Sequence, residues 1–147
     1  MAKERDFVLL RKVTLTCLGI AVVGAVTGHF VAPRLIPMIF GSDWHAALPV
    51  LDVFLIAIVV HVLAMMFGYP LAAGLDRVAV ANSSVVYGSL AYVALAGGLL
   101  VSRTVNPTSL AWLLAISETY VLLHCALLLW PAARRQYWRR LAEQQGT

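Results

Sequence analysis

Four long apolar stretches, separated by short polar segments, run along the chain: residues 13–33, 46–75, 78–102 and 104–133. Two of them carry no formal charge, and the other two carry only Asp52 and only Glu118. Each has about 20 residues or more, enough at 1.5 Å per residue to cross a hydrocarbon core of about 30 Å. Backbone polar groups must pair internally in lipid, and the short alternating segments of a membrane barrel are absent. The pattern predicts an all-α membrane protein whose four transmembrane helices cover about residues 9–39, 45–74, 78–101 and 108–130.

The composition also indicates that the chain is embedded in lipid. Hydrophobic residues make up 61% of its 147 positions and charged residues 12%, against about 45–50% and about 25% in soluble domains. A soluble domain of this length could not bury so much apolar surface in one core. The same balance excludes a disordered chain, a disulfide-stapled secreted domain and a typical nucleic-acid-binding domain.

Lysine and arginine are distributed unevenly between the two ends of the predicted helices. Two of them, Arg34 and Arg103, lie at one end. The other nine lie at the opposite end: Lys3, Arg5, Arg11, Lys12, Arg77, Arg134, Arg135, Arg139 and Arg140. By the positive-inside rule, both termini and the second loop are expected in the cytoplasm. The predicted location is the cytoplasmic (inner) membrane, with multiple passes.

A basic segment before an apolar run can also open a signal peptide. Here the run exceeds the usual 7–15 residues, and no A-x-A cleavage signal closes it. We therefore expect the segment to remain as the first membrane helix. Cys17 and Cys125 both fall in the middle of predicted helices, which favours small buried side chains over a disulfide or a metal pair.

Small residues recur at four-residue spacing in two predicted helices. The first helix has Gly24, Gly28 and Ala32, and the third has Ser84 and Gly88. This spacing lets the backbone of another helix approach closely. We expect these five residues to lie at helix–helix contacts.

Prolines are expected to disturb the regular helices. Pro33 and Pro37 should bend or break the outer end of the first helix, and Pro70 should kink the second near its inner end. The fourth helix is expected to end at about residue 130, just before Pro131. Residues 1–133 would then form the transmembrane domain, and residues 134–147 a basic juxtamembrane tail.

Several residues have the character of membrane-interface anchors. Trp44 suits the aromatic belt, and His29 and Arg34 are expected to reach the outer interface. The tail interleaves basic and aromatic residues: Arg134, Arg135, Trp138, Arg139 and Arg140. Directly after a membrane helix, such a run favours lipid headgroups as partners over nucleic acid.

Four ionisable residues fall inside the predicted spans: Asp52, His61, Glu118 and His124. Such residues are costly in lipid and usually face a pathway or a partner, so they are the candidate substrate or ion contacts. The alternative is that each lies near a helix end or pairs within the bundle. Asp52 and His61 point to opposite faces at 100° per residue, so one site would need other helices.

No motif in the sequence points to catalysis. A phosphate-binding glycine loop, a nucleophile elbow and HExxH are all missing. The four histidines do not share a metal-ligand spacing. We expect no enzyme activity, no cofactor and no metal.

Several segments resemble the C-terminal domain of polysaccharide and O-antigen flippases, in the multidrug/oligosaccharidyl-lipid/polysaccharide exporter superfamily. Residues 32–41 read APRLIPMIFG, similar to that family's proline-broken P-x-x-I-P-x-x-F-G exit. Residues 44–51, WHAALPVL, resemble the opening of its next helix, and Ile116-Ser117-Glu118 resembles an acidic position in a later one. A long helix with a Gly-rich inner turn before a small, polar helix is also shared. The likeness covers about residues 9–135.

The resemblance implies part of a flippase that moves lipid-linked oligosaccharide or polysaccharide precursors by rocking helix bundles around a central cavity. Such a transporter has two lobes, whereas this chain supplies four helices and no first lobe. A remaining lobe or a homo-oligomer is therefore an expected partner, besides membrane lipids and the glycan substrate. Two alternatives remain open: a small four-helix multidrug-type exporter working as a homodimer, and a non-transporting membrane assembly subunit.

Overall fold

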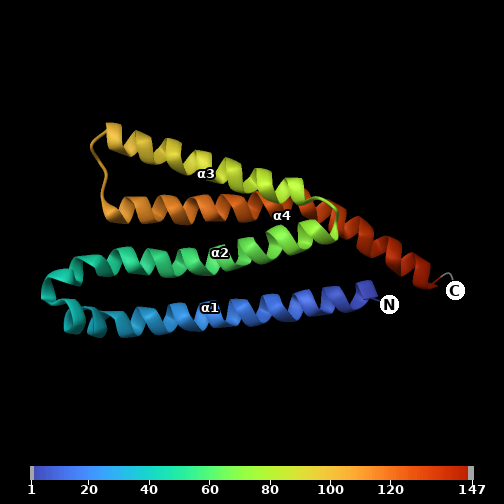
Figure 1. The fold of residues 1–147 in the computed structure, drawn as a ribbon, viewed down its shortest axis with the longest axis horizontal. Coiled ribbons are helices and arrows are strands. Elements are labelled where there is room, and N and C mark those ends of the chain that lie inside the picture. Colours follow the sequence, from blue (N-terminus) through green and yellow to red (C-terminus); the bar gives the residue numbers. More distant parts are fainter. Residues whose placement is uncertain (1, 146–147) are drawn as a thin grey trace.

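The computed structural model describes the backbone of residues 2–145 and the side chains of residues 9–135. Its elements are α1 (Ala2–Phe40), the short 3-10 helix η1 (Ser42–Ala47), α2 (Leu48–Gly74), α3 (Val78–Val101) and α4 (Pro107–Gln145) (Figure 1). Helix accounts for 93% of the described residues, and no strand occurs among them. Four segments are long and apolar enough to cross a membrane: Leu9–Phe40, Ser42–Gly74, Val78–Val101 and Pro107–Arg135. The prediction of four such helices is confirmed.

The prolines do not break the helices as expected. The first helix continues through Pro33 and Pro37 to Phe40. The chain turns instead at Gly41, whose φ of 94° is readily adopted only by glycine. α4 likewise continues through Pro131, so its predicted end near residue 130 is wrong and the basic tail extends the same helix. A proline removes one backbone hydrogen bond, a loss that membrane helices tolerate where neighbouring groups pair the freed carbonyl.

The four helices form an open antiparallel layer, in the order α1, α2, α4 and α3 (Figure 1). Both termini lie at the same end as the α2–α3 turn. α2 packs against α1 on one side and α4 on the other, while α3 packs mainly on α4. Within the described residues, α1 touches no long helix except α2. The arrangement differs from a closed four-helix bundle, in which every helix would face a common core.

The core consists of two small clusters where α2 meets α4. The cluster at the η1 end contains Val53, Ala57, Ala111 and Ala115. The cluster at the opposite end adds α3 and contains Ala72, Ala81, Cys125 and Leu129. Small side chains at these contacts let the helix backbones approach closely. In the most apolar window of each span, only 6–17% of residues are buried within the chain, so lipid or another protein must cover the rest.

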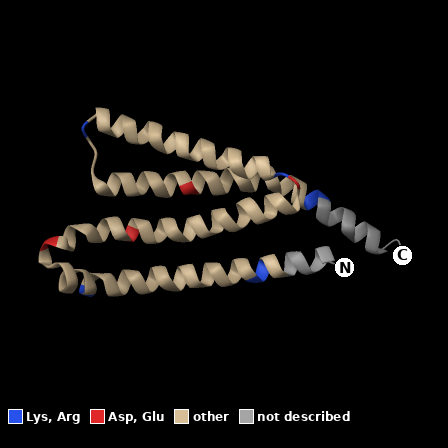
Figure 2. Cartoon of the chain, viewed as in Figure 1, with Lys and Arg blue, Asp and Glu red and all other residues tan. Residues whose placement is uncertain are grey.

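Formal charges concentrate at the two ends of the layer (Figure 2). Arg11, Arg77, Arg134 and Arg135 belong to the end with the termini, whereas Arg34 and Arg103 belong to the end with η1. Between these ends, the described spans hold only the acidic residues Asp52 and Glu118 (Figure 2). The interior of the layer is therefore apolar except at a few positions, and its two acidic residues are each paired with a histidine on a neighbouring helix.

Candidate functional site

Glu118 and His61 meet where α2 packs against α4. Nδ1 of His61 lies 3.0 Å from Oε2 of Glu118. The glutamate side chain is 22% exposed and the histidine side chain 51% exposed. His61 lies near the middle of α2, and Glu118 is separated from both ends of its span by at least two turns. The two residues thus form an acid–imidazole pair within two of the segments that are long and apolar enough to cross a membrane.

The pair borders a cavity of about 110 Å³ between α2, α3 and α4. Its polar lining includes Tyr69, Ser89 and Ser117 besides His61 and Glu118. Apolar residues complete the wall: Ala64, Met65, Gly68, Ala81, Val85, Val121 and Cys125. A space of this size with several polar groups can hold water molecules or a small polar ligand. The His61 side chain lines this cavity and is also about half exposed at the surface of the chain.

A hydrogen bond from Tyr69 to Asn82 links α2 to α3 beside the cavity. The Tyr69 hydroxyl donates to Oδ1 of Asn82 at 2.8 Å. Tyr69 belongs to the cavity wall, so this bond fixes part of the lining. The amide NH₂ of Asn82 has no partner among the described residues and provides two further donors at this edge.

Asp52 does not belong to this cavity. Its Oδ1 lies 2.8 Å from Nδ1 of His29, joining α2 to α1 in the half of the layer next to η1. The two side chains are about half exposed. Asp52 and His61 were expected to point to opposite faces of their helix. In the structure, Asp52 pairs with α1 and His61 pairs with α4. The sequence predicted that His29 reaches the outer interface, and it did not predict the pairing of His29 with Asp52.

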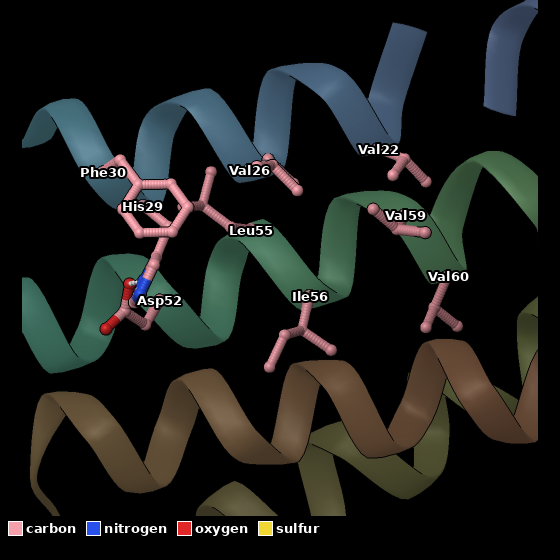
Figure 3. A pocket seen from close by; sticks show the side chains of 10 residues that line it. Val22, Val26, His29, Phe30, Asp52, Leu55, Ile56, Val59 and Val60 are labelled. Atoms are coloured by element: carbon pink, nitrogen blue, oxygen red, sulfur yellow. Dashed lines mark hydrogen bonds and ion pairs between the residues drawn. The ribbon is translucent and has the colours of Figure 1, made fainter. Parts of the chain in front are cut away.

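The His29–Asp52 pair lies at one end of an apolar groove between α1 and α2 (Figure 3). The groove has a volume of about 470 Å³. Figure 3 shows valine and isoleucine side chains continuing from the pair along the two helices. Apart from His29 and Asp52, its lining is apolar: Val22, Ala25, Val26, Phe30, Leu55, Ile56, Val59 and Val60. A groove with this lining suits the binding of apolar hydrocarbon chains.

His124 forms a third polar contact, between α4 and α3. Its Nδ1 lies 2.7 Å from the hydroxyl oxygen of Ser84, which is fully buried. Tyr120 stacks on the imidazole with ring centroids 5.6 Å apart, and Tyr87 meets it edge-on at 6.2 Å. His124 does not line the cavity beside Glu118. The four predicted pathway residues therefore fall into three places, and only His61 and Glu118 come together.

The predicted packing residues differ in what they meet. Gly88 and Ser84 are buried against α4, and a Cβ at Gly88 would lie 2.5 Å from Cγ2 of Val121. A Cβ at Gly28 would lie 3.1 Å from Cδ2 of Leu55 in α2. Gly24 is different, because a Cβ there would meet nothing within 4 Å. The expected contact at Gly24 is therefore missing in the described chain, because at that turn Ala25 and Val26, and not the exposed Gly24, line the groove beside α2. Ala32 is partly buried.

Of the predicted interface anchors, those with described side chains lie at the two ends of the layer. Trp44 is exposed in η1 and packs against Phe40 with ring centroids 5.6 Å apart. Arg134 and Arg135 are exposed, and Nε of Arg135 donates to the carbonyl of Pro131 at 3.2 Å. The side chains of Trp138, Arg139 and Arg140 lie outside the described residues.

Residues 9–135 contain no group of three or more His, Cys, Asp or Glu side chains placed to hold a metal ion. Sequence reasoning missed the pairing of Asp52 with His29, and it missed the Tyr69–Asn82 hydrogen bond beside the cavity. The sequence gives one weak indication of these pairs, which is that the polar side chains lie on different helices at similar distances from the helix ends. That distance limits which residues can pair, but it does not say which helices are neighbours.

Comparisons with protein-family models, with curated proteins and with solved structures find no match for this chain.

Proposed function

We propose that the chain is part of a flippase that moves lipid-linked oligosaccharide or polysaccharide precursors across the cytoplasmic membrane. The proposal combines the resemblance of residues 32–41, 44–51 and 116–118 with one structural observation. That observation is the His61–Glu118 pair beside a polar-lined cavity within the membrane-spanning part. Glu118 is the acidic position that the resemblance assigns to the transport domain.

The chemistry of this pair suits a coupling role. A carboxylate and an imidazole that share a hydrogen bond can hold one proton or two, and each state has a different net charge. In a low-dielectric environment, that change in charge alters the cost of opening the site to water. Cavity opening and proton occupancy would therefore depend on each other, as transport coupling requires.

The open layer supports a role as one portion of a larger transporter. The cavity is walled by three helices of this chain, and both broad faces of the layer are largely uncovered. A second lobe placed over one of these broad faces would enclose a path between the two lobes. The basic ends of the helices, including Arg77 and Arg134, would then lie in the cytoplasm.

Deletion of the coding sequence in its native strain tests this function. We expect lipid-linked glycan precursors to accumulate in the cytoplasmic leaflet, and expression of the chain in trans to restore their export. Leaflet location is measured by accessibility of the glycan to an added glycosidase in intact and in opened cells. Unchanged accessibility in the deletion strain would refute a role in flipping.

The same open layer fits the second candidate, an autonomous exporter that works as a homodimer. Such an exporter needs a stable symmetric dimer, because a single layer encloses no pathway. Mass measurement of the detergent-solubilised chain separates the candidates. A stable dimer active in a reconstituted export assay would favour the exporter, and a partner lobe recovered with the chain would favour the flippase.

A further inference from the structure

Tyr87, Tyr120 and His124, here called the aromatic cluster, form a second polar site that the His61–Glu118 pair does not use. The α3–α4 contact, where Ser84 and Gly88 are buried, separates it from the cavity. Glu118 and His124 are six residues apart, so they point about 120° away from each other around α4. None of the three cluster residues lines the cavity. The cluster therefore lies on the opposite broad face of the layer.

The two contacts of the Ser84 hydroxyl favour one tautomer of His124. The Ser84 hydroxyl lies 2.7 Å from the carbonyl oxygen of Val80 and 2.7 Å from Nδ1 of His124. A carbonyl only accepts, so both contacts are hydrogen bonds only when the single serine proton goes to Val80 and Nδ1 of His124 donates to the serine oxygen. In the neutral imidazole, Nε2 is consequently an acceptor with a free lone pair, and no described residue donates to it.

The tyrosine hydroxyls add two more polar groups without partners. Tyr87 is 54% and Tyr120 is 42% exposed, and neither hydroxyl hydrogen-bonds to any described residue. Tyr87 is nine residues into α3, about 14 Å from the end of the helix at 1.5 Å per residue. That depth is close to the middle of a hydrocarbon core of about 30 Å. The hydroxyl is therefore too deep to reach the headgroups.

Three unpaired polar groups facing lipid at this depth would be costly, because each would lose its hydrogen bonds without replacement. A matching partner must therefore offer hydrogen-bonding groups and a flat apolar surface for the tyrosine rings. It must also be uncharged, since none of the described Asp, Glu, Lys or Arg side chains pairs with the cluster. Glu118, the one formal charge in residues 104–133, is engaged with His61 on the other face.

We propose that the aromatic cluster binds a neutral saccharide ring. A sugar ring can lay its C–H face on the tyrosine rings, as apolar surfaces do on aromatic faces. One sugar hydroxyl can donate to Nε2 of His124, and others can pair with the two phenolic hydroxyls. This choice of ligand rests on the proposed function. It adds that the uncharged sugars bind on a different face of the layer from the His61–Glu118 pair.

Cysteine accessibility in membranes of the native strain tests this site in the intact assembly. The reporter is Leu127→Cys, introduced into a chain whose two native cysteines have been replaced by Cys17→Ser and Cys125→Ala. Leu127 is exposed on the face of α4 that carries Tyr120, and its replacement keeps all three cluster residues. The matched control is Val86→Cys, next to Tyr87 but turned away from α4. Opened vesicles are treated with a hydrophilic maleimide, which reacts only with a hydrated thiolate.

We expect the reporter to react at least tenfold faster than the control, and 50 mM maltose to slow its reaction at least fivefold. Inorganic phosphate at the same concentration should not protect. The double substitution Tyr87→Phe/Tyr120→Phe should remove protection while labelling continues. Equal rates at the two positions would mean that lipid or a protein helix covers the face, and would overturn the proposal. Labelling without maltose protection, or with equal phosphate protection, would overturn the ligand assignment, and neither result bears on Glu118.

Discussion

Nδ1 of His61 lies 3.0 Å from Oε2 of Glu118, and this contact joins α2 to α4 beside the cavity. Removing the histidine should leave the acid without a partner inside the membrane. We expect His61→Leu to lower the free energy of unfolding by about 1–3 kcal/mol, because the carboxylate must then stay unpaired or take up a proton. Thermal unfolding of the detergent-solubilised chain measures the effect.

The double variant His61→Leu/Glu118→Leu is the control for that result. Removing both partners takes away the unpaired charge, so the melting temperature should recover above that of the single variant. A double variant less stable than His61→Leu would show that the two side chains stabilise the protein independently.

Gly88 is predicted to be intolerant of even one added methyl group. A Cβ there would lie 2.5 Å from Cγ2 of Val121, whose β-branched side chain has one preferred rotamer in a helix. Gly88→Ala should destabilise the chain by about 1–3 kcal/mol, measured by thermal unfolding. Gly97→Ala is the matched control, since a Cβ at Gly97 would meet nothing within 4 Å. Val121→Ala should rescue Gly88→Ala, and failure of the rescue would refute this contact.

The glycines of α1 allow a test of which turn faces α2. Gly28→Leu should strongly reduce folded yield, because Cδ2 of Leu55 occupies the space beside Gly28. Gly24→Leu should be tolerated in the isolated chain, since no described atom lies near that position. Yield is measured by size-exclusion chromatography of a fluorescent fusion. If both variants fold equally well, α1 does not pack on α2 at this turn.

Much of the fold follows from the sequence, because helix number and span depend on local hydrophobicity. Long uncharged stretches need helices in lipid, and turns fall at Gly41, near Asp76 and near Arg103. Helix ends near proline were harder to predict. At Pro33, Pro37 and Pro131 a proline carries a steric penalty, but the need to pair backbone groups in lipid favours a continuous helix.

The site was only partly predictable, for a different reason. Spacing along α2 correctly separates Asp52 from His61, because both lie on one helix. Spacing cannot say that α2 lies between α1 and α4, which pairs Asp52 with His29 and His61 with Glu118. Neighbour order depends on the summed packing of whole helix faces. Gly24 and Gly28 share one motif, yet only Gly28 faces Leu55.

Orientation in the membrane is predicted from the charges at the two ends of the layer. The nine-to-two distribution of lysine and arginine places η1 outside and both termini inside. A cysteine at Ser42 should react with an impermeant thiol reagent added to intact cells, and one at Gln144 should react only after the cells are opened. Both are introduced after replacement of Cys17 and Cys125. The reverse labelling pattern would invert the topology.

Substitution of Glu118 by glutamine in the native strain tests the central claim most directly. The amide keeps the shape and the hydrogen-bonding capacity of the side chain but can neither carry charge nor exchange a proton. Asp76→Asn is the matched control, since it makes the same chemical change in an exposed turn whose left-handed φ of 54° suits asparagine. For Glu118→Gln, we predict normal amounts of the chain in the membrane and loss of surface polysaccharide, while Asp76→Asn keeps both. Normal surface polysaccharide in a Glu118→Gln strain with normal membrane levels would contradict the account and leave Glu118 with a packing role only.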